Sequence, residues 1–206
     1  MSFTPAIFIS ASVPDPRRDA RFFRTGDTFA IRDSLLALAE VFAPDFFLVF
    51  GGHPAITPLV ARIAETLHLE ERFVVYQSLE FEDEFPVELE SLPNVIYTKK
   101  LENSARSLEQ LRFRMLHDSP FQAAFFLGGM DGVLAEYELL STLPQRPHLF
   151  PIATTGGAAG ILAEQYRFQL PDIDGLTDTY DYVTLFRRIV RFLEESGSVQ
   201  VASGSR

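Results

Sequence analysis

The sequence predicts an α/β protein with one doubly wound parallel sheet and helices on both faces. Short apolar runs, such as residues 46–50 (FFLVF), are typical of strands that are covered on both sides. Segments with helical periodicity, such as residues 30–42, alternate with these runs, and this alternation predicts right-handed crossovers between parallel strands. With 206 residues, 47% of them hydrophobic, the chain is long enough to bury one sizeable core.

The predicted elements follow one another with few interruptions. Strands are expected where short apolar runs end at Gly, Pro or polar residues, at residues 6–10, 46–50, 73–77, 95–98, 123–127 and 149–153. Helices are expected at residues 30–42, 54–67, 105–117, 131–143, 157 to about 166, and 182–192. Loops are expected at the acidic residues 80–90 and at residues 171–181. We therefore expect one Rossmann-like domain over residues 1–195 and a flexible tail over residues 196–206.

Composition excludes several classes of function. The formal net charge of −10 argues against sequence-independent binding of nucleic acid. The absence of cysteine excludes disulfides, thiolate metal sites and cysteine nucleophiles. The four histidines lack metal-ligand spacing, so neither a metal nor a cofactor is expected. No apolar run approaches the roughly 18 residues of a membrane span, and no leader is recognised, so we expect a cytoplasmic protein without membrane contact. A homodimer is left open.

Small and polar residues follow the predicted strands, where ligands bind in doubly wound sheets. Glycine lets a phosphate approach backbone N–H groups, and the start of the next helix supplies further donors. We expect the N–H groups of Gly52 and Gly129 to point into one shared cleft. The alternative is a set of tight turns without a ligand. The candidate ligand-binding residues are Ser10, Ser12, Gly51, Gly52, His53, Gly128, Gly129, Met130, Asp131, Gly132, Thr155 and Gly156.

Neighbouring polar residues have two interpretations each. Ser10 and Ser12 could bind a ribose or base, and Asp131 is a candidate N-cap for the following helix. The stretch Tyr76-Gln77-Ser78 followed by Glu80, Glu82, Asp83 and Glu84 could recognise ribose hydroxyls through a carboxylate, or the acidic cluster could be a solvated loop. The basic cluster Arg17, Arg18, Arg21 and Arg24 could reach over the cleft to phosphates, or belong to a surface loop.

The two glycine turns resemble those of the SLOG superfamily, which includes the "lonely guy" phosphoribohydrolases and nucleotide sensors. The resemblance rests on IFISASVPD, FGGHPAITPLV and FFLGGMDGVLAE and covers residues 6–166. It is greatest for the SLOG domains of bacterial conflict systems. The phosphoribohydrolase motif Pro-Gly-Gly-x-Gly-Thr-x-x-Glu is altered here, because Leu127 replaces the proline, one residue is inserted before Gly132, and Val133 replaces the threonine.

The resemblance implies two functions. The first is binding of a nucleotide-derived ligand, of ADP-ribose or cyclic-nucleotide type, by a sensor in bacterial stress or antiphage signalling. The alternative is a hydrolase that cleaves an N-glycosidic bond in a nucleoside monophosphate or in NAD. In that case Glu136 would stabilise the developing charge on the sugar, and Arg112 would orient the phosphate or ribose. Phe113 stands where the family usually has a lysine.

Overall fold

The sheet contains six strands in the computed structural model, which describes residues 3–197. In chain order they are β1 (Ala6–Ser12), β2 (Phe47–Gly51), β3 (Phe73–Ser78), β4 (Asn94–Thr98), β5 (Phe121–Gly128) and β6 (His148–Pro151). All pairs of neighbouring strands are parallel, and their order is β4-β3-β2-β1-β5-β6. The predicted α/β, Rossmann-like fold is confirmed.

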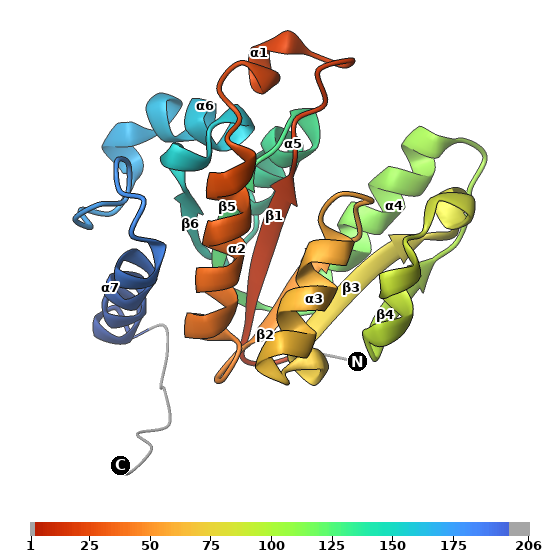
Figure 1. The fold of residues 1–206 in the computed structure, drawn as a ribbon, viewed down its shortest axis with the longest axis horizontal. Helices are drawn as coiled ribbons and strands as arrows, with labels where there is room; N and C mark the ends of the chain where they lie inside the picture. Colours follow the sequence, from red (N-terminus) through yellow and green to blue (C-terminus); the bar gives the residue numbers. More distant parts are fainter. Residues whose placement is uncertain (1–2, 198–206) are drawn as a thin grey trace.

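Helices cover both faces of the sheet (Figure 1). They are α1 (Ala20–Phe23), α2 (Thr28–Phe42), α3 (Thr57–Leu67), α4 (Ser104–His117), α5 (Asp131–Ser141), α6 (Gly157–Gln165) and α7 (Tyr182–Glu195). The apolar residues of α2, α3 and α7 pack with one face of the strands, and those of α4, α5 and α6 pack with the other. Alternate residues of each strand therefore enter different halves of the core.

The order of the strands places a topological switch point beside β1. From β1 the chain adds β2, β3 and β4 on one side, and then returns to add β5 and β6 on the other. Ligands of such sheets bind outside the carboxyl ends of the strands near this point. The residues that end β1 and β5 are therefore in the expected position for a site.

Side-chain caps begin several helices, and these caps were not among the features predicted from the sequence. The carboxylate of Asp27 accepts a hydrogen bond from the N–H of Ala30 at the start of α2. Asn103 caps α4 and Asp181 caps α7 in the same way. These bonds satisfy N–H groups that the helix itself leaves without partners.

Two segments differ from the expected elements. The acidic residues 80–90 form two 3₁₀ helices, Leu79–Glu84 and Val87–Ser91, instead of an irregular loop. The buried side chain of Leu89 ties the second of them to the core. The last strand ends at Pro151, and a 3₁₀ turn follows at Ala153–Thr155. Of the expected tail, residues 198–206 lie outside the described residues.

The short helix α1 was also not expected. Its buried Phe22 anchors the segment between β1 and α2 against the core. No helix within residues 3–197 combines the length and the apolar character that a membrane span requires.

Candidate functional site

A cavity of about 340 Å³ lies at the carboxyl ends of β1, β2 and β3, between the helices α4 and α5. We call it the Glu136 cavity. It brings together nine of the candidate catalytic and ligand-binding residues, which are Ser10, Ser12, Gly51, Gly52, His53, Arg112, Met130, Gly132 and Glu136. Their assignment to a function remains a prediction.

A largely buried carboxylate is the main polar feature of the Glu136 cavity. The side chain of Glu136 projects from α5 and is 16% exposed. Its Oε2 accepts a hydrogen bond of 2.5 Å from the hydroxyl of Ser10 at the end of β1. Its Oε1 lies 3.6 Å from Nε of Arg112, which comes from α4. The two residues that the family resemblance pairs are thus in contact across the cavity.

The contact between Arg112 and Glu136 is an ion pair that is too long for a hydrogen bond. The Nε of Arg112 is buried and donates to no other atom of the described residues. A buried donor without a partner costs free energy. Arg112 therefore has unused capacity to donate to a bound ligand.

Burial raises the pKa of the Glu136 carboxyl above its ordinary value of 4.5. The hydrogen bond from Ser10 and the positive charge of Arg112 act in the opposite direction but do not cancel this effect. The site therefore holds its carboxylate in an environment that disfavours the negative charge. Carboxylates at functional sites often have such an environment.

Replacement of Glu136 by Gln should stabilise the protein at neutral and alkaline pH. Because the pKa of Glu136 is higher in the folded than in the unfolded chain, its ionisation destabilises the fold above the folded pKa. This penalty shrinks as the pH falls through the folded pKa towards 4.5, and it is gone below 4.5, where the carboxyl is protonated in both states. Thermal melts of wild type and Glu136→Gln at pH 8 and pH 4.5 should differ most at pH 8. A variant that melts below wild type at pH 8 would contradict the expected sign.

The first turn of α5 presents backbone donors beside this pair. The N–H groups of Asp131 and Gly132 donate to no residue of the described chain. A Cβ at Gly132 would lie only 3.3 Å from a terminal nitrogen of Arg112, so this glycine leaves room for the guanidinium. Free helix N–H groups next to a guanidinium favour an anion such as phosphate.

The expected N-cap at Asp131 is wrong. Met130 is the N-cap of α5, and no side chain caps this helix. The carboxylate of Asp131 instead pairs with Arg21 at 3.1 Å, which joins α5 to α1. Because the carboxylate of Asp131 does not cap the helix, the N-terminus of α5 has no side-chain hydrogen bond and is open.

His53 lies where β2 leads towards α3. Burial and the positive charge of Arg18 lower the pKa of its imidazole, so the ring is neutral at neutral pH. Its Nδ1 lies 3.1 Å from the N–H of Ala55 and accepts a hydrogen bond. The proton of the neutral ring is therefore on Nε2, which is a donor available to a ligand.

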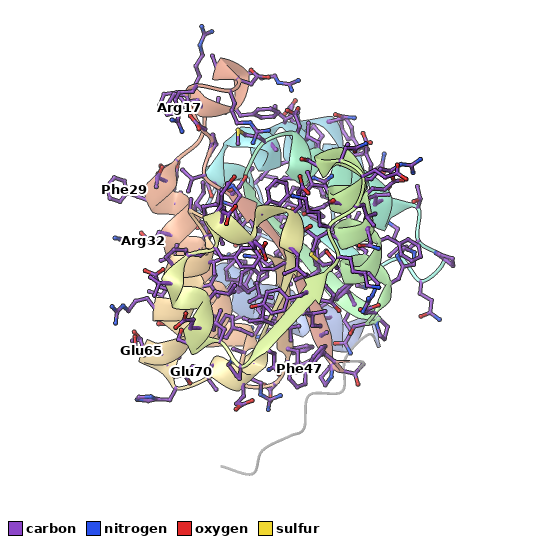
Figure 2. All side chains as sticks on the ribbon, turned by 90° about the vertical axis from the view of Figure 1, so that its right-hand side faces the viewer. Arg17, Phe29, Arg32, Phe47, Glu65 and Glu70 are labelled. Atoms are coloured by element: carbon purple, nitrogen blue, oxygen red, sulfur yellow. The ribbon has the colours of Figure 1, made fainter. Side chains whose placement is uncertain are left out.

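Of the four clustered arginines, Arg18 lines the Glu136 cavity. It forms no ion pair with the residues that the structure describes. Arg17 pairs with Asp15 at 2.8 Å and projects away from the molecule (Figure 2). Arg18 is thus the member of the cluster that is free to meet a phosphate at the cavity mouth.

The N–H groups of the two glycines do not point into a shared cleft, in contrast to the expectation. The N–H of Gly52 donates to the carbonyl of Tyr76 at 2.8 Å, and that of Gly129 donates to the carbonyl of Ser12 at 2.7 Å. Both bonds continue the pairing of neighbouring strands. Gly129 has a φ of +82°, a backbone conformation that favours glycine, and this accounts for the glycine at this position.

The remaining candidates lie outside the Glu136 cavity. Gly128 has a φ of +58°, and its N–H donates to the hydroxyl of the buried Thr155. Gly156 packs against the backbone of Thr25 and lines a separate, shallow hollow with Tyr180. In the structure, Thr155 holds the second glycine turn in place.

Several apolar residues of the cavity were not predicted from the sequence to lie at the site. The apolar cavity residues on α4 are three and four positions apart, and this spacing predicts that one face of the helix is buried. It does not predict that this face borders a cavity. The others come from the segment that follows β3. The apolar residues are Phe81, Phe85, Leu108, Leu111 and Met115.

Comparison with known proteins supports the resemblance read from the sequence. A model of the SLOG cluster3 family matches residues 21–190. The match includes both glycine turns as well as Arg112 and Glu136. A comparison with curated proteins finds no match.

Proposed function

The chain belongs to the SLOG cluster3 family, and on this premise we propose that it binds a nucleotide-derived ligand, of ADP-ribose or cyclic-nucleotide type, in the Glu136 cavity. Membership of the family indicates a nucleotide-related function. As the resemblance of residues 6–166 implies, we further propose a cytoplasmic sensor in bacterial stress or antiphage signalling.

The arrangement of Glu136, Arg112 and Ser10 beside the open N-terminus of α5 carries this proposal. A carboxylate accepts hydrogen bonds from vicinal hydroxyls, as the ribose of a nucleotide offers. The guanidinium of Arg112 and the free N–H group of Gly132, two residues that line the cavity, favour a phosphate. The cavity therefore presents groups for both parts of a sugar phosphate.

The size of the cavity limits what it can enclose. Its volume of about 340 Å³ is near the lower end of the range for small-molecule sites, about 300 to 1,000 Å³. It suits one nucleoside monophosphate unit. A larger ligand such as ADP-ribose would extend beyond the mouth, where the exposed Arg18 can meet its second phosphate.

Replacement of Gly132 by Val should weaken binding by about 10-fold or more, because the side chain would crowd the Arg112 guanidinium and the free N–H groups. Isothermal titration calorimetry of AMP, ADP-ribose, cyclic ADP-ribose and NAD against wild type and Gly132→Val tests this. Ser141→Val, at the far end of the same helix, should bind like wild type. Folded wild-type protein that binds none of the four would contradict the proposed function.

The contact between Glu136 and Arg112 also favours a second function, hydrolysis of an N-glycosidic bond. A carboxylate close to the ribose can stabilise positive charge that develops on the sugar as the base leaves. Release of adenine from AMP, or of nicotinamide from NAD, by wild type but not by Glu136→Gln would support it. Binding of AMP or NAD without release of the base would contradict hydrolysis and support the sensor function.

A further inference from the structure

Gln77, at the end of β3, has an unusual environment. Its side chain lines the Glu136 cavity, yet the residue is only 5% exposed. Within residues 3–197 its amide group has no hydrogen-bond partner. Neither polar atom of this amide is among the fully buried unpaired atoms of the described residues, so the amide opens into the cavity, where a bound ligand can reach it.

Gly52 makes room for this amide. A Cβ at Gly52 would lie 2.2 Å from the amide carbon of Gln77, which no real contact allows. Gly52 has no positive φ, so its backbone conformation does not require glycine. The glycine turn after β2 thus admits the side chain of Gln77 from the neighbouring strand.

The positions of Gln77 and Glu136 match the two ends of a nucleoside. Ser10, the hydrogen-bond partner of Glu136, is on β1, and Gln77 is two strands away on β3. Adjacent strands are about 4.8 Å apart, so the two positions are separated by about 10 Å, roughly the length of one nucleoside. Apolar side chains suited to the faces of a base, including Phe81 and Met115, also line the cavity.

We propose that Gln77 is a specificity-determining residue whose side-chain amide binds the edge of the ligand's base and selects adenine over guanine. This inference rests on the proposed function. An amide offers one donor and one acceptor side by side, and it pairs with the N6 amino group and a ring nitrogen of adenine. Glu84, which lines the same cavity, favours an amino group over the O6 carbonyl of guanine.

The test is the affinity for AMP, GMP and ribose 5-phosphate of wild type, Gln77→Glu and Gln77→Leu. Wild type should prefer AMP to GMP by about 10-fold. Gln77→Leu should lose this preference, and Gln77→Glu should reverse it, because a carboxylate accepts from the two donors of guanine. The affinity for ribose 5-phosphate, which has no base, should stay the same in all three proteins.

Gln77→Leu should also melt no lower than wild type, because the amide has no partner to lose. Gln169→Leu, an exposed glutamine outside the cavity, is the matched control and should leave all three affinities unchanged. An AMP to GMP ratio that is the same in wild type and both Gln77 variants would overturn the inference and leave the proposed function standing. Wild type that binds neither AMP nor ribose 5-phosphate would instead contradict the proposed function, and the inference with it.

Discussion

Gly156→Ala should lower the melting temperature by about 6 to 12 °C, a loss of about 3 kcal/mol in the free energy of unfolding. Gly156 has a φ of +65°, and a Cβ there would lie 1.7 Å from the carbonyl oxygen of Thr25. The obstacle is backbone and cannot rotate away. Nearby, the N–H of Gly157 donates to the hydroxyl of Thr25, and the N–H of Asp27 donates to the carbonyl of Thr155. The substitution would therefore separate two interlocked loops, and thermal melts measure the cost.

Gly160→Ala, in the same helix α6, is the matched control. A Cβ at Gly160 would lie 3.5 Å from the carbonyl oxygen of Ala153, an ordinary contact, and no positive φ is present. Alanine is favoured over glycine within a helix by about 0.5 to 1 kcal/mol, so this variant should melt slightly above wild type. Equal melting temperatures of Gly156→Ala and Gly160→Ala would contradict the close approach of the loops that contain Thr25 and Gly156.

The fold could be predicted because its signals are local. An apolar run such as residues 46–50 (FFLVF) forms a strand that has to be covered on both faces. The segments of helical periodicity between such runs predict the helices that cover it. The short helix α1 escaped prediction because its four residues contain less than two turns and are held by one buried side chain, Phe22. Its existence depends on the core beneath it, which the local sequence does not describe.

The site could be predicted only in part, because a glycine after a strand has several causes. Gly132 borders the cavity and leaves room for Arg112, whereas Gly52 admits Gln77 from the neighbouring strand. Gly129 adopts a positive φ, and Gly156 passes close to another loop. All four occur in similar local sequence, and only the tertiary structure distinguishes them.

Arg112→Ala should weaken nucleotide binding by about 30-fold or more, which corresponds to about 2 kcal/mol. The substitution removes the buried donor of the cavity and leaves Glu136 without its cation. Arg106→Ala is the matched control on the same helix. Its guanidinium pairs with Glu109 at the surface, where both side chains are more than half exposed, so its loss should change neither binding nor stability measurably.

The effect of Arg112 on the protein itself can be separated from its effect on the ligand. The charge of Arg112 lowers the pKa of Glu136, so Arg112→Ala should raise that pKa further and destabilise the fold at pH 8, with recovery as the pH falls. Addition of Glu136→Gln to Arg112→Ala should restore the melting temperature at pH 8, because no uncompensated carboxylate remains. It should not restore nucleotide affinity, because both ligand-binding groups are then absent. A double variant that regains stability and affinity together would show that the pair acts on the fold alone.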